Sequence, residues 1–173
     1  MIGYGKIGQD KDNKMKKDEK TNVMRVLDQK KITYKSHMYE PDSTMSGEEI
    51  AGILNENPDK VFKTLVTQGK SKGYYVFVVP VKCELDLKKA AKAAREKSIA
   101  MIKQKDLLLL TGYVHGGCSP IGMKKQFPTF LHESAQNYDT IYVSAGKLGF
   151  QIELSPKDLM SVVSYEFVDI VTE

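Results

Sequence analysis

The sequence predicts an α+β fold: a single domain with a curled, barrel-like mixed β-sheet flanked by helices. Its 173 residues are the length of one domain. Strand-like runs outnumber helical patterns and do not alternate strictly with them, as they would in a parallel α/β fold. Hydrophobic residues make up 41% and charged residues 28% of the chain, which is enough apolar mass for a core.

Residues 1–20 form a charged leader, with six lysines and four acidic residues among three glycines. This composition cannot bury an apolar face, so we expect a disordered tail or one held by a neighbouring molecule. Met15 offers an alternative natural start, in which case the preceding residues are an upstream addition. The folded domain is therefore expected over residues 21–173.

Four helices are predicted from signals at their N-termini, and each signal precedes apolar residues at helical spacing. A fifth helical turn, over residues 105–110, is expected to end at Gly112. The capping signals are Thr21, Ser46 with Glu49, Asp86, and Ser155 followed by Pro156.

Strand-like runs account for most of the remaining chain. A glycine-containing segment joins the second and third runs and predicts a hairpin, and Gly146–Gly149 predicts a tight connection between the fifth and sixth. The runs are residues 32–39, 61–67, 74–81, 129–132, 140–144, 150–154 and 167–171.

Composition excludes several classes of protein. The sequence has no run of eighteen apolar residues, so a membrane span is excluded. The leader lacks the apolar segment of a secretory signal. Cys83 and Cys118 are too few and too far apart for a disulfide framework or a zinc site. We expect a cytoplasmic protein with both thiols reduced.

The formal net charge of +4 conceals an asymmetry along the chain. Residues 60–125 contain fourteen Lys or Arg and four acids, whereas residues 153–173 contain five acids and one lysine. This distribution favours a basic face that binds a phosphate-bearing partner. A lysine-rich helix surface that is merely solvated explains it equally well.

Motifs for common cofactors are missing: there is no phosphate-binding loop, dinucleotide fingerprint, C-x-x-C or H-E-x-x-H. His37, His115 and His132 are scattered, so we expect surface or hydrogen-bonded histidines and neither a metal nor another cofactor. Ser119 and Ser144 lack the sequence context of a nucleophilic serine.

Three segments suggest a site, each with an ordinary structural alternative. Lys63 interrupts an apolar strand, so its ammonium group either reaches solvent at the sheet edge or points into a pocket. Gly116 and Gly117 allow close backbone approach to an oxyanion or phosphate, but also suit a tight turn. Ser144 follows a strand and precedes Gly146, as in any hairpin.

Taken together and in this order, Phe62–Leu65, Gly116–Gly122 and Tyr142–Gly146 resemble the YbaK/EbsC family. The resemblance extends from Thr21 to Thr172. It is closest to the Cys-tRNA(Pro) deacylases, which share a fold with the editing domain of prolyl-tRNA synthetases. It implies trans-editing, the hydrolysis of the ester that joins a wrong amino acid to tRNA. Because such an ester is already activated, positioning and oxyanion stabilisation can suffice without a general base.

The resemblance also implies site residues. Lys63 matches an essential strand lysine, expected at the terminal phosphate or the ester, and Thr64 is expected to hold the adenosine. The N–H groups of Gly116 and Gly117 are expected to face the scissile carbonyl, which makes these glycines catalytic together with Lys63.

Two further residues are expected to bind substrate through the same resemblance. Ser144 is expected to contact the ligand, and Tyr39 corresponds to a pocket-lining tyrosine. Cys118 lies beside the glycines, but no histidine or carboxylate adjoins it in sequence, so a nucleophilic role is disfavoured. In the cysteine-specific subgroup, the substrate's own thiol is implied to attack its ester carbonyl. Cys83 is expected to be a filler residue.

The expected partner is the acceptor end of mischarged tRNA(Pro), and prolyl-tRNA synthetase is a candidate second partner. Two alternatives stay open at this point. The substrate could carry alanine or serine instead of cysteine, or the domain could bind tRNA or an adenine nucleotide without catalysis.

Overall fold

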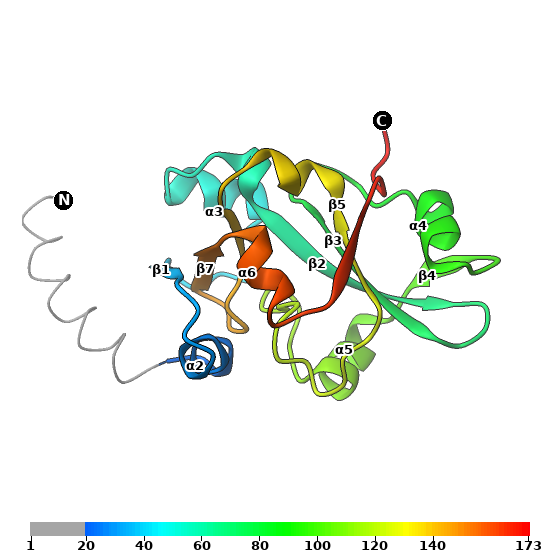
Figure 1. Cartoon of the computed structure of the whole chain (residues 1–173), viewed down its shortest axis with the longest axis horizontal. Coiled ribbons are helices and arrows are strands. Elements are labelled where there is room, and N and C mark those ends of the chain that lie inside the picture. Colours follow the sequence, from blue (N-terminus) through cyan, green and yellow to red (C-terminus); the bar gives the residue numbers. More distant parts are fainter. Residues whose placement is uncertain (1–19) are drawn as a thin grey trace, which may run out of the picture.

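The structure is a computed structural model that describes residues 20–173 (Figure 1). The prediction of a leader over residues 1–20 therefore lies outside the described residues, apart from Lys20. The elements in chain order are α2 (Asn22–Gln29), β1 (Lys35–Met38), α3 (Gly47–Ile53), η1 (Pro58–Lys60), β2 (Phe62–Gly69), β3 (Tyr74–Pro80), α4 (Leu87–Ala94), β4 (Ile99–Met101), α5 (Gln104–Thr111), β5 (Thr129–His132), η2 (Glu133–Asn137), β6 (Ile141–Ser144), β7 (Phe150–Leu154), α6 (Pro156–Met160) and β8 (Tyr165–Val168).

The strands form two sheets, one with the order β4-β2-β3-β5-β8 and the other with the order β1-β7-β6. The β3–β5 and β5–β8 pairs are parallel and the other pairs are antiparallel, so the predicted α+β class with a mixed sheet is confirmed. The strands do not close into a barrel, which corrects the barrel-like part of the prediction. A single parallel bridge between Val61 and Tyr142 joins the two sheets, and β1 and β8 remain at opposite ends of the strand order.

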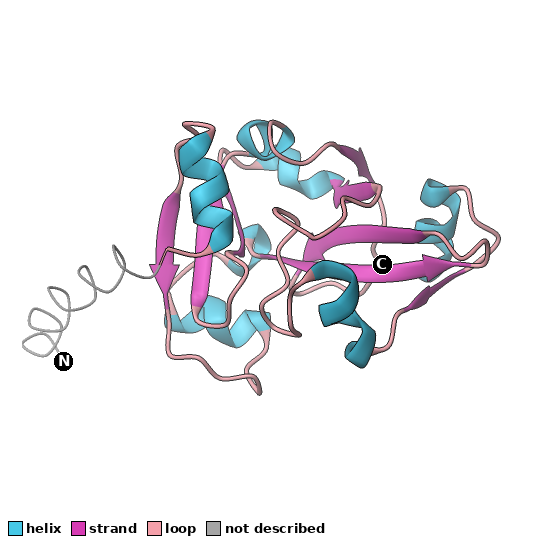
Figure 2. Ribbon diagram, turned by 90° about the horizontal axis from the view of Figure 1, so that it is seen from below, coloured by secondary structure: helices cyan, strands magenta, loops and turns pink. Residues whose placement is uncertain are grey.

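The main core lies between the apolar faces of both sheets and α2, whose Val23 and Leu27 are fully buried. A second, smaller cluster fills the other face of the five-stranded sheet beneath α4, where the rings of Phe77 and Phe130 stack with centroids 5.2 Å apart. Figure 2 shows the helices distributed around the strands rather than along one side. The helices within residues 20–173 are all too short or too polar to span a lipid bilayer.

The predicted helix starts are confirmed. The Thr21 hydroxyl accepts a hydrogen bond from the Met24 N–H, and Ser46 and Glu49 form a reciprocal capping box. Asp86 caps α4, and Ser155 accepts from the Asp158 N–H. The predicted C-terminal end of α5 is Gly112, whose φ of 85° is favourable only for a residue without a Cβ.

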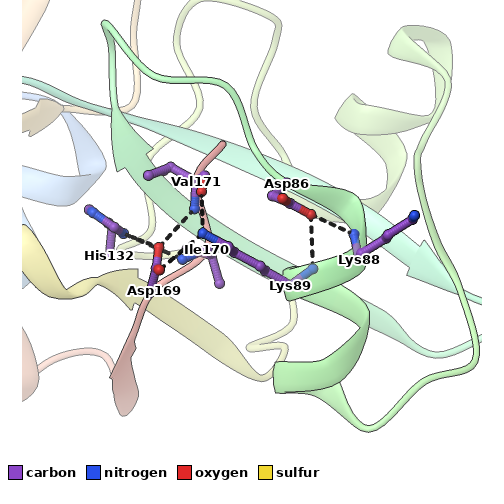
Figure 3. Close-up of polar contacts among 7 residues, drawn as sticks. All are labelled: Asp86, Lys88, Lys89, His132, Asp169, Ile170 and Val171. Atoms are coloured by element: carbon purple, nitrogen blue, oxygen red, sulfur yellow. Dashed lines mark hydrogen bonds and ion pairs between the residues drawn. The ribbon is translucent and has the colours of Figure 1, made fainter. Parts of the chain in front are cut away.

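The C-terminal strand differs from its prediction. β8 spans Tyr165–Val168, because its partner in parallel pairing is Thr129–His132, and residues 169–171 continue as a single bridge between Val171 and Leu85. Figure 3 shows how this end is held: Lys89 Nζ donates to Asp169 Oδ2 at 3.0 Å and to the Val171 carbonyl at 2.9 Å. The short strand β4 was not predicted.

Candidate active site

The bridge between the two sheets brings two predicted site residues to neighbouring positions. Val61 and Tyr142 pair in parallel, and Lys63 and Ser144 each lie two residues further along their strands. Side chains two residues apart point to the same side of a strand, and parallel strands keep their alignment. Lys63 and Ser144 are therefore expected on the same face of the joined sheets, each two residues beyond the isolated bridge.

The same face continues across the three-stranded sheet. Ser144 is opposite Gln151 in β7, and Gln151 is opposite His37 in β1. Tyr39 lies two residues beyond His37, and its backbone N–H donates to the Gly149 carbonyl at 3.0 Å. We call this surface, with His37, Tyr39, Val61, Lys63, Tyr142, Ser144, Gln151 and Glu153, the polar sheet face. Its opposite side, with Ile141, Val143 and Ile152, belongs to the main core.

The glycine loop packs against the turn that follows Ser144. A Cβ built on Gly117 would lie 3.1 Å from the Leu148 nitrogen, and Gly116 has a φ of +85°. The loop is anchored from inside by the buried Tyr113, whose hydroxyl donates to the Ile121 carbonyl. Both loops therefore lie at the carboxyl end of β6, next to Ser144.

The two glycine amides are not equivalent. Gly117 N–H donates to the Val114 carbonyl at 3.0 Å, and is therefore already used within the loop. Gly116 N–H has no acceptor within residues 20–173, and Gly116 is exposed. Of the two amides predicted to face a scissile carbonyl, Gly116 is the one whose N–H is available to a ligand.

Lys63 and Thr64 are adjacent in β2 and consequently point to opposite faces. The Lys63 side chain is half-buried, and no described residue forms a hydrogen bond or ion pair with it. Thr64 shares its face with Phe62 and Val66, which belong to the main core, and its hydroxyl is buried without a hydrogen-bond partner. The structure thus groups Lys63, Ser144 and Tyr39 on the polar sheet face and places Thr64 behind it.

Several polar residues of this face were not predicted, and they form a connected network. Thr140 donates to Glu153 Oε2 at 2.6 Å, and His37 Nε2 lies 3.1 Å from Glu153 Oε1. Burial acts to raise the pKa of Glu153, but the hydrogen bonds from Thr140 and His37 outweigh it, and the pKa is lowered. Lys60 Nζ donates to Thr140 at 3.3 Å and lies 5.4 Å from the centre of the Tyr142 ring.

Glu56 has the most perturbed carboxyl group of this region. Burial raises its pKa to about 7 from 4.5, the neighbouring Gln151 and Lys60 lower it, and Glu153 raises it further. Both carboxylate oxygens are buried without a hydrogen-bond partner. Gln151 is close enough to stabilise the charged form, but no hydrogen bond of standard geometry joins the two side chains, and Gln151 Oε1 is itself buried and unpartnered.

One sequence signal could have found part of this network. In residues 150–154, Gln151 and Glu153 alternate with Phe150, Ile152 and Leu154, so strand alternation alone puts both polar residues on the side away from the core. Glu56 has no comparable signal, because it lies in the irregular segment between α3 and η1 and reaches the sheet only through tertiary packing.

The cysteines lack the features of nucleophiles. Cys118 is 8% exposed, and burial raises the pKa of its thiol to about 12, so the thiol is protonated at neutral pH. Cys118 packs in the main core and Cys83 is half-buried. The disfavoured nucleophilic role of Cys118 is consistent with these surroundings.

The histidines are polar contacts, as predicted. His37 contacts Glu153, His132 Nδ1 accepts from the Ile170 N–H at 3.4 Å, and His115 is exposed. Residues 20–173 contain no group of three or more His, Cys, Asp or Glu side chains arranged to hold a metal ion.

A cavity of about 490 Å³ lies elsewhere, bordered by Lys89, His132 and Asp169. It contains none of the predicted site residues. Lys89 and Asp169 on its border form an ion pair at 3.0 Å (Figure 3). We therefore place the candidate site on the polar sheet face rather than in this cavity.

Comparison with known proteins gives one family. Residues 41–162 match the aminoacyl-tRNA editing domain family. The proposed Cys-tRNA(Pro)/Cys-tRNA(Cys) deacylase EbsC of Enterococcus faecalis is 48% identical over 161 residues, which cover 92% of this chain and 98% of that protein. The uncharacterised protein YwhH of Bacillus subtilis is 25% identical over 68% of this chain and 74% of its own length.

Solved structures agree with this result. A proposed trans-editing enzyme for prolyl-tRNA synthetase matches with a TM-score of 0.73 and 26% identity, over 81% of this chain and 87% of that one. The hypothetical protein APE2540 has a TM-score of 0.79 at 20% identity, over 87% of this chain and 99% of its own, which supports the fold alone.

Proposed function

The chain belongs to the aminoacyl-tRNA editing domain family, and we propose that it is a deacylase that releases cysteine from mischarged tRNA(Pro). The resemblance to the YbaK/EbsC family is thereby confirmed. The observation that carries the proposal is the 48% identity to EbsC, which extends over nearly the whole of both chains. The name of that relative also includes Cys-tRNA(Cys), so we propose that the domain recognises cysteine more strictly than it recognises the tRNA.

The reaction needs no nucleophile from the protein. We propose that the substrate's sulfur attacks its own ester carbonyl, which forms a carbon–sulfur bond and breaks the bond to the ribose oxygen. The thiol proton passes to the departing ribose hydroxyl, and water then opens the thiolactone to free cysteine. This route is compatible with the buried, protonated thiol of Cys118. The protein's contribution is orientation of the thiol and stabilisation of the developing oxyanion.

The polar sheet face supplies groups for both tasks. Lys63 is a half-buried residue whose ammonium group has no partner within the described chain, and this group is suited to the terminal phosphate or the ester oxygen. Gly116 supplies an amide without an acceptor at the loop beside Ser144. Ser144 and Tyr39 lie on the same face and are proposed to contact the acyl group. Gly117 acts by allowing the loop to approach Leu148. The expected adenosine contact of Thr64 is not part of this proposal, because its buried hydroxyl lies on the opposite face of β2.

The tRNA body is proposed to contact the basic end of the molecule. Exposed lysines and an arginine are carried by α4, by the β2–β3 turn and by the segments around β4, and these elements lie together at one end in Figure 1. They are Lys70, Lys72, Lys88, Lys92, Arg95, Lys97 and Lys103. The strand β2 leads from Lys63 to this end over seven residues, or about 23 Å. Contact with prolyl-tRNA synthetase and a cytoplasmic location remain proposals that follow from such a substrate.

The test is deacylation of a panel of mischarged tRNAs under single-turnover conditions. We expect cysteine to be released from tRNA(Pro) at least tenfold faster than alanine or serine, and far above spontaneous hydrolysis. Faster release of alanine or serine would transfer the assignment to the alternative substrates. Tight binding of tRNA with release no faster than in buffer would support the non-catalytic alternative instead.

A further inference from the structure

We propose that Glu56 binds the α-ammonium group of the aminoacyl ester, so that the enzyme selects acyl groups with a free amine. This inference rests on the proposed function. It adds a substrate-binding residue that lies outside the segments carrying the family resemblance, and it defines the class of acyl groups that the site accepts.

The first observation is that the Glu56 carboxylate lacks the partners that a buried carboxylate requires. Both of its oxygens are shielded from solvent, and neither accepts a hydrogen bond of standard geometry, the nearby Gln151 amide being the one side chain that approaches them as a donor among the described residues. A buried carboxylate is stable only when it is protonated or paired with a cation that also donates hydrogen bonds. The burial that raises the pKa of this group to about 7 reflects the same deficit.

The second observation is that the nearby charged side chains are already occupied or are of the wrong sign. Among residues 20–173, Lys60 is the one cation that acts on Glu56 electrostatically, but its ammonium donates to Thr140 and lies over the Tyr142 ring. Glu153 is negative and already forms hydrogen bonds with Thr140 and His37. Within the described chain, no cation is therefore left to neutralise Glu56 by direct contact.

The third observation is a second unmatched acceptor beside the carboxylate. Gln151 is 5% exposed, and its Oε1 atom is buried without a donor. The Glu56 oxygens and Gln151 Oε1 are thus acceptors without a donor of standard geometry, although the Gln151 amide lies close enough to lower the pKa of Glu56. A ligand group with several N–H donors would match these acceptors. An ammonium group has three donors and the compensating charge.

The position of this pair fits the proposed orientation of the substrate. Gln151 is directly opposite Ser144 in the β6–β7 register, and Ser144 and Lys63 each lie two residues beyond the bridge that joins the sheets. An ester held near Lys63 and Gly116 therefore has its α-carbon close to the strand that carries Gln151. Because the carboxylate oxygens are shielded from solvent, the surrounding side chains must rearrange when the ammonium enters.

The test compares two acyl groups that both carry the thiol. Cysteinyl-tRNA(Pro) has the α-ammonium group, and 3-mercaptopropionyl-tRNA(Pro) lacks it but can still form a thiolactone. We expect Glu56→Gln to lower kcat/KM for the cysteinyl substrate at least tenfold and for the mercaptopropionyl substrate by less than threefold. Glu48→Gln, an exposed carboxylate of α3, is the matched control and should change neither value.

Each other outcome is decisive. An equal loss on both substrates would give Glu56 a structural role and overturn the inference, as would no loss on the cysteinyl substrate. If the wild-type protein releases no cysteine at all, the proposed function fails first, and the inference fails with it. Should Glu56→Gln not fold, Glu56→Asp keeps the charge. The inference requires Glu56→Asp to retain a higher kcat/KM for the cysteinyl substrate than for the mercaptopropionyl substrate. If Glu56→Asp lowers kcat/KM equally for both substrates, the inference is overturned.

Discussion

Gly117 and Leu148 lie in such close contact that a Cβ at Gly117 would be 3.1 Å from the Leu148 nitrogen. The contact joins the glycine loop to the β6–β7 turn, two segments about thirty residues apart in the chain. Backbone atoms of Lys147 and Leu148, rather than a flexible side chain, limit the space available to a side chain at Gly117. This contact sets the position of Gly116 relative to Ser144.

Gly117→Ala should therefore separate the two loops. We expect a loss of about 1–2 kcal/mol in the free energy of unfolding, since the backbone must shift to accept the methyl group. We also expect a deacylation rate at least tenfold lower, because the Gly116 amide moves away from Ser144. Denaturant unfolding and single-turnover deacylation measure the two effects.

Gly52→Ala is the matched control. Gly52 lies within α3, and a Cβ there would meet nothing within 4 Å. Alanine is favoured over glycine in a helix by about 0.5–1 kcal/mol, so this variant should be slightly more stable than wild type and fully active. If both variants behave alike, the loop contact has no special role.

The two cysteines should be dispensable. Because burial raises the pKa of the Cys118 thiol to about 12, no thiolate is available at neutral pH. The Cys83→Ser/Cys118→Ser variant should release cysteine from tRNA(Pro) within threefold of the wild-type rate. A substrate acylated with 2-aminobutyrate, which has the same shape but no thiol, should react at least a hundredfold more slowly. Loss of activity in the serine variant, with the fold intact, would reject the substrate-assisted route.

Glu56 should make the protein less stable as the pH rises. Its pKa is about 7 when folded against 4.5 as a free side chain, so the folded state binds the proton more tightly. The stabilisation is therefore complete below pH 4.5 and is lost as the pH rises through 7. Allowing for the partial exposure of the side chain, we expect a loss of about 1–2 kcal/mol between pH 5 and pH 8.

Glu56→Gln removes this titration. Urea unfolding should show that the free energy of unfolding falls less between pH 5 and pH 8 in the variant than in the wild type. At pH 8 the variant should therefore be the more stable of the two proteins. The neighbouring groups that also titrate or carry charge are His37, Tyr39, Lys60, Tyr142 and Glu153, and they are the same in both proteins. If the free energy of unfolding depends on pH identically in both proteins, burial does not raise the pKa of Glu56 in the folded state.

The basic end should dominate the affinity for tRNA. Replacing Lys70, Lys92 and Lys97 with glutamine removes three exposed charges without touching the polar sheet face. We expect weaker binding of tRNA, and a slope of log affinity against log salt that is smaller by about 0.7–0.9 for each lost phosphate contact. Filter binding at several salt concentrations measures the slope.

An equal change of charge elsewhere provides the control for that variant. Arg25, Lys30 and Lys157 are also exposed but lie on α2, next to its C-terminus and on α6. Their replacement with glutamine should leave the salt slope within about 0.5 of the wild-type value. If both triple variants lower the slope equally, the tRNA responds to net charge rather than to this end of the molecule.

Capping signals within one helical turn predicted where the helices begin. The arrangement of the sheets instead depends on pairing between strands that are far apart in sequence, which such signals do not reveal. Ser46 with Glu49 and Ser155 with Pro156 identify helix starts because a cap depends on residues within one turn. The three-residue strand β4 has no such signal and exists because Thr67–Gly69 offers it an edge to pair with. The two sheets are joined by one bridge, Val61 with Tyr142, and these residues are too far apart in sequence for local signals to reveal the pairing.

The site shows the same division. Lys63, Ser144 and Tyr39 were identified by family resemblance, and the register of β2, β6, β7 and β1 explains why they share a face. The inequivalence of the Gly116 and Gly117 amides depends on one hydrogen bond to Val114, which spacing cannot reveal.

The most direct test of the account is the single-turnover release of cysteine from Cys-tRNA(Pro) by Lys63→Met, compared with Lys157→Met. Methionine keeps most of the side-chain volume of Lys63 and removes its ammonium group. We predict a rate at least a hundredfold below wild type for Lys63→Met, tRNA affinity within threefold, and no change for Lys157→Met. A Lys63→Met enzyme that still releases cysteine at the wild-type rate would contradict the placement of the active site on the polar sheet face.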